Sequence, residues 1–473
     1  MTKTKKLLSP LFSILMLTIL LIWGTGFSSA AETVTPVPAS GSSIETTEVT
    51  MEVLMNRINA LENQVTTLQE TITQLESRLD AVDDPELEAS LTSKFNTLFK
   101  GVTREMVGER DTLRFSGMNV QIVNGLGETS ILDGQGLGNL IIGYNKSRVT
   151  VLAPLKPEND VRTGSHNLIL GDYNNYEEDA FGGIVAGYYN QIGAPYASVL
   201  GGESNKALES AAAILGGNGN TASGKGATIS GGASNTAKGS YATISGGFSN
   251  MASGQYAFVG GGNKNTASNL FTAILGGYSN TASGVRASVS GGDANTASGA
   301  NASVAGGQSN QALGVNASVS GGSNNLASGT NASVSGGDQN TASGDGASVT
   351  GGSTNTASGI SSAVTGGLGN TTIGNNASVT GGQNNLASGA HASISGGDTN
   401  TASQRDASIL GGYKNTASGI ASTISGGGTN KATGTGSSVL GGGNNTAAGS
   451  GSVVIGGERQ TATGWYAILP MVE

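Results

Sequence analysis

A pair of adjacent glycines recurs every 15 residues along the C-terminal part of this chain, without one insertion or deletion. Eighteen such pairs run from Gly201 to Gly457 in the 473-residue sequence. In every copy a Val or Ile stands two residues before the pair, and Asn stands three residues after it, except in the last copy, which has Gln460. A strict period with fixed apolar, glycine and asparagine positions is typical of one supersecondary unit stacked on itself. The repeat therefore predicts a solenoid.

Each copy contains two short segments with the alternation of a β-strand. A typical copy is ASVSGGDANTASGAN at 287–301. In Ala-Ser-Val-Ser, the Ala and Val point to one side and the Ser residues to the other, which predicts a half-buried strand. The Gly pair predicts a turn that needs positive φ or close backbone approach, and Asn-Thr-Ala-Ser-Gly predicts the return strand. Two strands per copy indicate a mainly β fold, a parallel β-roll.

A single copy buries one Val or Ile and a few small residues, which is too little to offset the entropy of ordering it. Stability must therefore come from stacking on neighbouring copies. With strands about 4.8 Å apart, 18 copies predict a rod of roughly 85 Å. Along this rod the Asn column predicts a ladder of side-chain amides. The alternative is that Asn is present because it tolerates the turn conformation.

Composition limits the classes of function. The chain has 78 Gly, 12% charged residues, a net charge of −9 and no Cys. The acidic balance argues against a nucleic-acid partner, because phosphate binding needs clustered Lys and Arg. Residues 186–473 carry nine basic and nine acidic side chains, which disfavours charged partners of either sign. The lack of Cys excludes disulfides, thiolate metal sites and cysteine nucleophiles.

Residues 1–31 have the anatomy of a secretory signal peptide. Three lysines precede an apolar run from Leu7 to Trp23, and small residues lead to a predicted cleavage after Ala30 or Ala31. The alternative is an uncleaved anchor, for which an apolar run of about 17 residues is only just long enough. Either interpretation predicts that the rest of the chain is exported. Residues 32–50, rich in Thr, Ser, Val and Pro, predict an extended linker.

Residues 51–82 carry the heptad repeat of a coiled-coil stalk. Its a and d positions are occupied by Met51, Leu54, Ile58, Leu61, Val65, Leu68, Ile72, Leu75, Leu79 and Val82. The pairing of β-branched residues at a with Leu at d favours a dimer. Arg57-Ile58-x-x-Leu61-Glu62 instead resembles the Arg-h-x-x-h-Glu pattern, with h apolar, of trimeric coiled coils. Both strand numbers remain open, and we expect the trimer.

Between the heptads and the regular array we expect a second helix and an irregular β region. An Asp-Pro pair at 84–85 predicts the N-cap and first residue of a helix over 84–101, with Gly101 as its stop. Residues 111–196 are predicted to be a β neck. Within it, TLRF and NVQIV alternate like strands around Ser116-Gly117, and NLIIGYN, NLILGDYN and GIVAGYYN are loose relatives of the repeat at unequal spacing. The regular array follows over 197–473, where the aromatic residues of WYAILP are predicted to cap its end.

The order G-x-x-N-x-A-x-G-x-x-A-S-V-S-G over residues 186–470 resembles the head repeat of YadA-type trimeric autotransporter adhesins, roughly G-x-x-S-x-A-x-G-x-x-S-V-A-I-G. The resemblance implies a left-handed parallel β-roll in which three chains lie side by side. The chain departs from that pattern: Asn replaces Ser, the repeat is one residue longer, and the coiled coil precedes the head. Because Glu473 closely follows the last repeat, we also expect the family's C-terminal membrane anchor to be missing. The resemblance thus implies fold and trimeric assembly more directly than adhesion.

Residue types that carry catalysis or bind metals are scarce. His166 and His391 are the only histidines and lie far apart in sequence, so no His-based triad or zinc cluster is expected within one chain. Glu177, Glu178 and Asp179 form the best candidate for a cation site, although a solvated loop is the simpler interpretation. No catalytic residue, metal site or cofactor is predicted.

The leading hypothesis is a non-enzymatic, secreted, homotrimeric fibre at a bacterial surface. It predicts an adhesive or spacing role toward surface polymers, glycans or host matrix, and no nucleic-acid partner. A tether to the membrane would require an uncleaved signal segment. The alternative is an ice- or crystal-surface-binding solenoid, because Thr follows Asn in 12 of 18 copies, but residues such as Met251, Leu326 and Lys431 interrupt that column. An enzyme on a β-solenoid is disfavoured, because the array offers no cleft lined by acids or bases.

Overall fold

The structure is a computed structural model that describes residues 51–80, 85–129, 136–148 and 160–471. The predicted signal peptide and linker therefore lie outside the described residues. The chain divides into two compact units, Met1–Met118 and Asn119–Glu473.

The first unit contains two helices and a β-hairpin. Helix α2 covers Met51–Asp80 and helix α3 covers Pro85–Leu98, so both predicted helices are confirmed over these bounds. The apolar seam of α2, including Ile58 and Leu61, is exposed in the single chain. Gly101 follows α3 with φ of 88°, as expected of a stop. Neither described helix is long and apolar enough to cross a membrane.

The hairpin pairs strand β1 (Val102–Val107) with strand β2 (Arg110–Phe115) in antiparallel register. TLRF is thus part of a strand, as predicted, whereas the prediction of a strand at NVQIV is wrong. Strand β2 pairs with β1 instead, because only two residues, 108–109, separate these two strands in sequence. An exposed ion pair between Arg104 and Asp111 joins the strands. Its hydrogen bond holds the pKa of Asp111 below the usual value.

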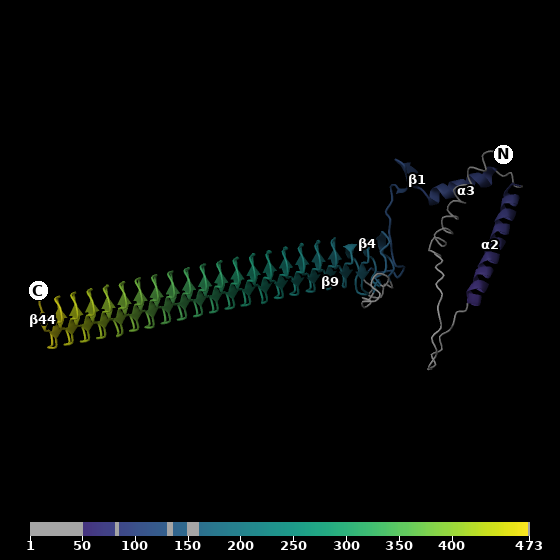
Figure 1. The fold of residues 1–473 in the computed structure, drawn as a ribbon. Coiled ribbons are helices and arrows are strands. Elements are labelled where there is room, and N and C mark those ends of the chain that lie inside the picture. The colour runs from purple at the N-terminus through teal and green to yellow at the C-terminus, as the bar shows by residue number, and fades with distance from the viewer. Residues whose placement is uncertain (1–50, 81–84, 130–135, 149–159, 472–473) are drawn as a thin grey trace, which may run out of the picture. The chain divides into compact units, whose positions relative to one another are not determined.

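The second unit is a parallel β-solenoid, which confirms the predicted fold class. One sheet begins with β3 (Leu140–Ile142), β4 (Leu168–Asp172) and β6 (Ile184–Tyr188), and continues through the first strand of each copy from β8 (Ser198–Val199) to β44 (Ile468–Leu469). The other sheet contains β5 (Asn175–Tyr176), β7 (Gln191–Ile192) and the return strand of each copy from β9 (Lys206–Ala207) to β43 (Thr461–Ala462). The strands of successive copies follow one another along this unit (Figure 1).

Register between copies is constant and matches the sequence period. Ser288 pairs with Ser303, and Val289 pairs with Val304. The backbone N–H of Ser288 donates to the carbonyl of Ala302 at 2.9 Å. Each copy is therefore hydrogen-bonded to the next at the same positions, in agreement with the constant 15-residue spacing of the regular array.

The core is a narrow row of small side chains that runs between the two sheets. Ala287, Val289 and Ala297 have no exposed surface, and equivalent residues form one cluster from Ile169 to Ala462. The inward direction predicted for the Ala and Val/Ile columns is therefore confirmed. The space between the sheets is narrow. Val or Ile fits on the first sheet because the residue that faces it on the second sheet is the small Ala.

The first turns of the solenoid lie within the predicted neck. Strands β3, β4, β6 and β8 pair in sequence and in parallel, so the loose relatives of the repeat stack on the regular copies. The longer loops of this region hold a buried charge. The side chain of Arg148 donates to the carbonyl of Tyr173 at 2.7 Å and to that of Asn190 at 2.8 Å, and lies over the Tyr189 ring.

The predicted aromatic cap is not formed in the described chain. Trp465 and Tyr466 are 81% and 76% exposed. Tyr466 has a positive φ, like the equivalent residues of the other copies. This conformation directs the side chains of the corner outward, away from the end of the core. Leu469 and Ala467 are the residues that pack against the core there.

Candidate interaction surface

The buried Asn column holds the turns of the solenoid together. The Oδ1 atom of Asn310 accepts a hydrogen bond from the backbone N–H of Asn325 at 3.0 Å. Its Nδ2 atom donates to the carbonyls of Gly306 at 2.8 Å and Gly322 at 2.9 Å. A continuous ladder exists, but it joins each amide to backbone groups rather than to other amides. The alternative explanation is wrong, because the positive φ belongs to the preceding residue, Ser309.

The two glycines of each pair have different roles. Gly322 has φ of 83°, and a Cβ there would collide with the carbonyl oxygen of Gly337. At Gly321, by contrast, a Cβ would meet nothing within 4 Å. The predicted requirement for positive φ and close approach is therefore confirmed for the second glycine of the pair. Contacts within one chain do not explain why the first position of the pair is also glycine.

Two outward corners of every copy adopt positive φ without requiring glycine. Ser309 and Asn316 have φ of 54° and 57°. This conformation turns their N–H groups back toward the preceding copy, where they donate to Asp293 and Ala300 at 2.8 Å. The frequency of Asn, Gly and Ser at these positions was the signal that sequence reasoning missed. The side chains at these corners vary from copy to copy. Some of them bond to their equivalents in the adjacent copies, as Asn316 does to Asn301 and Asn331 at 3.0 Å.

The outward side of the first sheet changes in character along its length. Its two outward columns hold only Ser, Thr or Ala from Ser288 to Ser395. Larger apolar side chains replace these residues in the flanking copies, at Leu200, Leu215, Leu275, Leu410 and Leu440, and all five are exposed. The surface is thus hydroxyl-rich in the middle of the array and apolar toward both flanks.

The structure brings no catalytic set together among the residues it describes. His166 accepts a hydrogen bond from the backbone N–H of Asn124 at 3.4 Å, whereas His391 is exposed at a corner of a distant copy. Glu177 bonds to Gln191, while Glu178 and Asp179 are exposed. Within the described ranges, no three His, Cys, Asp or Glu side chains are grouped to hold a metal ion.

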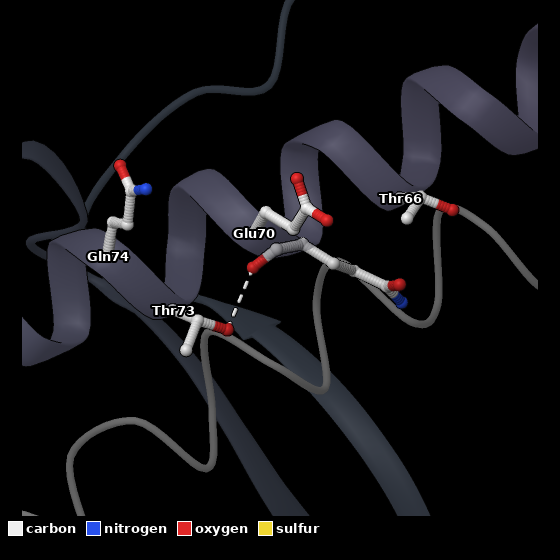
Figure 2. Close-up of a pocket in the computed structure, with 5 residues that line it drawn as sticks. Thr66, Glu70, Thr73 and Gln74 are labelled. Atoms are coloured by element: carbon white, nitrogen blue, oxygen red, sulfur yellow. Dashed lines mark hydrogen bonds between the residues drawn. The ribbon is translucent and has the colours of Figure 1, made fainter.

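One hollow lies along α2 rather than on the solenoid. It is lined by Thr66, Gln69, Glu70, Thr73 and Gln74. Figure 2 shows these side chains on one helix, with the Thr73 hydroxyl donating to the carbonyl of Gln69 at 2.9 Å. The lining contains a single ionisable group, Glu70, and so no acid–base pair.

Comparison with known proteins agrees with this arrangement. A family described as the ubiquitous surface protein adhesin repeat matches residues 242–254. The matched segment includes β14 (Thr243–Ile244), the Gly-Gly turn and β15 (Met251–Ala252). No curated protein matches the chain. The parallel solenoid and this match together indicate an adhesin-like, surface-exposed repeat protein.

Proposed function

We propose that the chain is a secreted, non-enzymatic, adhesin-like fibre at a bacterial surface. The match of residues 242–254 to an adhesin repeat, inside an array that presents the same outward positions in every copy, is the observation that supports this function. Many weak contacts along such an array add through avidity and need no deep pocket. The partners we propose are surface polymers, glycans or host matrix.

We further propose that the array is a YadA-type head and that the protein is a homotrimer. One observation supports the assembly. The α2 seam is exposed in one chain, with Leu61 and Leu68 57% and 61% accessible, as expected of a coiled coil seen without its partners.

The test is adhesion of the purified full-length protein to epithelial cells, matrix proteins and abiotic surfaces. Saturable binding that survives chelation and needs no cofactor is expected. Absence of binding to every surface would contradict the adhesive role and leave the array as a spacer.

Ice or crystal binding is the second candidate, because the Thr residues after the Asn column lie on an outward face in register. Gln311 and Leu326 occupy that column in successive copies and break its regularity. An assay of ice recrystallisation with the same protein decides between the two. Ice activity without adhesion would favour this candidate.

A further inference from the structure

Exposed aromatic side chains concentrate in a few neighbouring copies of the array. Five of them form what we call the aromatic patch: Tyr241, Phe248, Tyr256, Phe271 and Tyr278, each 44% to 47% exposed. Between residues 197 and 463, Tyr413 is the one other aromatic residue exposed to this degree. Large exposed aromatic groups so close together mark an interaction surface, since isolated ones are expected from random placement.

Three members of the patch stack along the solenoid. The Tyr241 and Tyr256 ring centroids are 5.3 Å apart, and those of Tyr256 and Phe271 are 5.1 Å apart, with interplanar angles of 8°. The faces of the middle ring are therefore covered, and ring edges point to solvent. Those edges carry the Tyr241 and Tyr256 hydroxyls, which have no hydrogen-bond partner among the described residues.

The other two members, Phe248 and Tyr278, follow β14 and β18 (Ala273–Ile274) in sequence, beyond the Gly-Gly turn, in the column of bridges that joins successive copies. Between the stack and these residues the outward strand positions hold the exposed Leu275 and the half-buried Phe258. The patch therefore has aromatic side chains before and after these strands in sequence, and apolar side chains in between.

Basic residues are concentrated in and next to the copies that carry the patch, although the array as a whole is balanced in charge. Residues 210–292 contain four basic side chains and no Asp or Glu: Lys225, Lys238, Lys264 and Arg286. Residues 293–404, by comparison, contain four Asp and no Lys or Arg. Lys264 Nζ lies 5.8 Å from the Tyr278 ring centroid, and Arg286 Cζ lies 6.0 Å from that of Phe271. The aromatic patch thus lies in the most positively charged part of the array.

We propose that the aromatic patch binds an acidic polysaccharide. This inference rests on the proposed adhesive function and assigns it a site. The apolar faces of sugar rings pack against Leu275 and Phe258, sugar hydroxyls bond to the hydroxyls at the Tyr edges, and carboxylates or sulfates pair with the nearby Lys and Arg. Single-stranded nucleic acid fits less well, because its bases need open ring faces on which to stack, and the stacked rings cover one another.

The experiment measures binding of the full-length protein to immobilised hyaluronate, chondroitin sulfate, neutral dextran and single-stranded DNA. One variant, Y256A/F271A, removes the stack, and another, K225Q/R286Q, removes the two cations nearest its ends. A third, Y241F/Y256F, removes only the hydroxyls, so that folding is preserved. The matched control is Y413A/K414Q, because that pair also places a Lys over an exposed Tyr, at 4.8 Å, but lies outside the patch. Melting curves verify that each variant is folded.

We expect binding to both acidic polysaccharides and none to dextran. The stack and cation variants should bind at least about tenfold more weakly, the hydroxyl variant should also bind more weakly, and the control should stay within about twofold of wild type. Equal binding by folded variants, equal binding to dextran, or tighter binding to DNA than to either polysaccharide would overturn the inference.

Adhesion to epithelial cells is measured in parallel to separate the two proposals. Adhesion without polysaccharide binding would overturn the patch and leave the proposed function standing. Polysaccharide binding that needs the patch, without adhesion to any surface, would support the patch and contradict the adhesive role.

Discussion

Val319 illustrates how a single buried residue supports the array. It is 1% exposed, and its neighbour Ser318 lies on the outward side of the same strand. V319D would place an unpaired charge in a narrow apolar core, so we expect a loss of about 3 to 5 kcal/mol in the free energy of unfolding. S318D is the control and should cost less than about 1 kcal/mol. Similar denaturant midpoints for both variants would contradict the inward assignment.

The two glycines at 321 and 322 provide a second matched pair. G322A combines a positive φ with a backbone clash, and we expect it to destabilise the protein by at least about 2 kcal/mol. G321A adds a methyl group in open space and should change stability by less than about 1 kcal/mol. Thermal melting by far-UV circular dichroism measures both. If G321A were the more damaging of the two, the structural distinction between the glycines would be wrong.

The Asn column makes a prediction that depends on pH. In N310D, a carboxyl group would face the carbonyls of Gly306 and Gly322, where the amide now donates. Burial and these oxygens should raise its pKa above the usual value of about 3.9. The group is then tolerated best when protonated, and stability should fall as pH rises through the raised pKa.

Urea unfolding at pH 4 and pH 8 measures this effect. The control is N310A, which loses the same hydrogen bonds without adding a titratable group, so its loss of stability should be similar at both pH values. A loss for N310D that did not grow with pH would show that the carboxyl group is solvated rather than buried.

At the scale of elements, helix α2 is where assembly is expected to be decided. Its seam has no partner within the described chain, and a lone helix gains little stability from propensity alone. We expect wild-type protein to sediment as a trimer and L61D to dissociate, because a charge at a d position disrupts the seam. N63D, on the opposite side of the heptad, is the control. Sedimentation combined with light scattering gives the masses, and a wild-type monomer would contradict the assembly.

At the scale of the whole molecule, the array should respond to shortening in a graded way. Deleting residues 287–301 removes one copy and joins two neighbours whose register is identical. Such a protein should remain folded, since each copy contacts only the adjacent ones. Adhesion should weaken gradually as further copies are removed, because avidity depends on the number of contacts.

A control deletion keeps copies 227–286, which contain the aromatic patch, and removes copies elsewhere. If the patch carries most of the binding, this series should lose adhesion more slowly than one that removes the patch first. Adhesion that vanished only when residues 111–196 were removed from a folded protein would instead place function in the neck.

Much of this fold follows from the sequence, because the same local rules are repeated eighteen times with one period. The alternation around Val289 determined the inward face, and the spacing between glycine pairs determined the register. Helices over 51–80 and 85–98 followed from the heptads and the Asp-Pro start. The patch was harder to recognise, because its residues are scattered in sequence and the charge balance of the whole array conceals a basic segment.

Only the tertiary structure decided what links one copy to the next. The amide of Asn310 bonds to carbonyls in its own copy and in the next, and Gly322 is required because Gly337 lies against it. Likewise, Tyr241, Tyr256 and Phe271 meet only after the chain has made a full turn between them. These contacts join residues a whole copy apart, so their geometry depends on how the turns stack, which the pattern within a single copy does not contain.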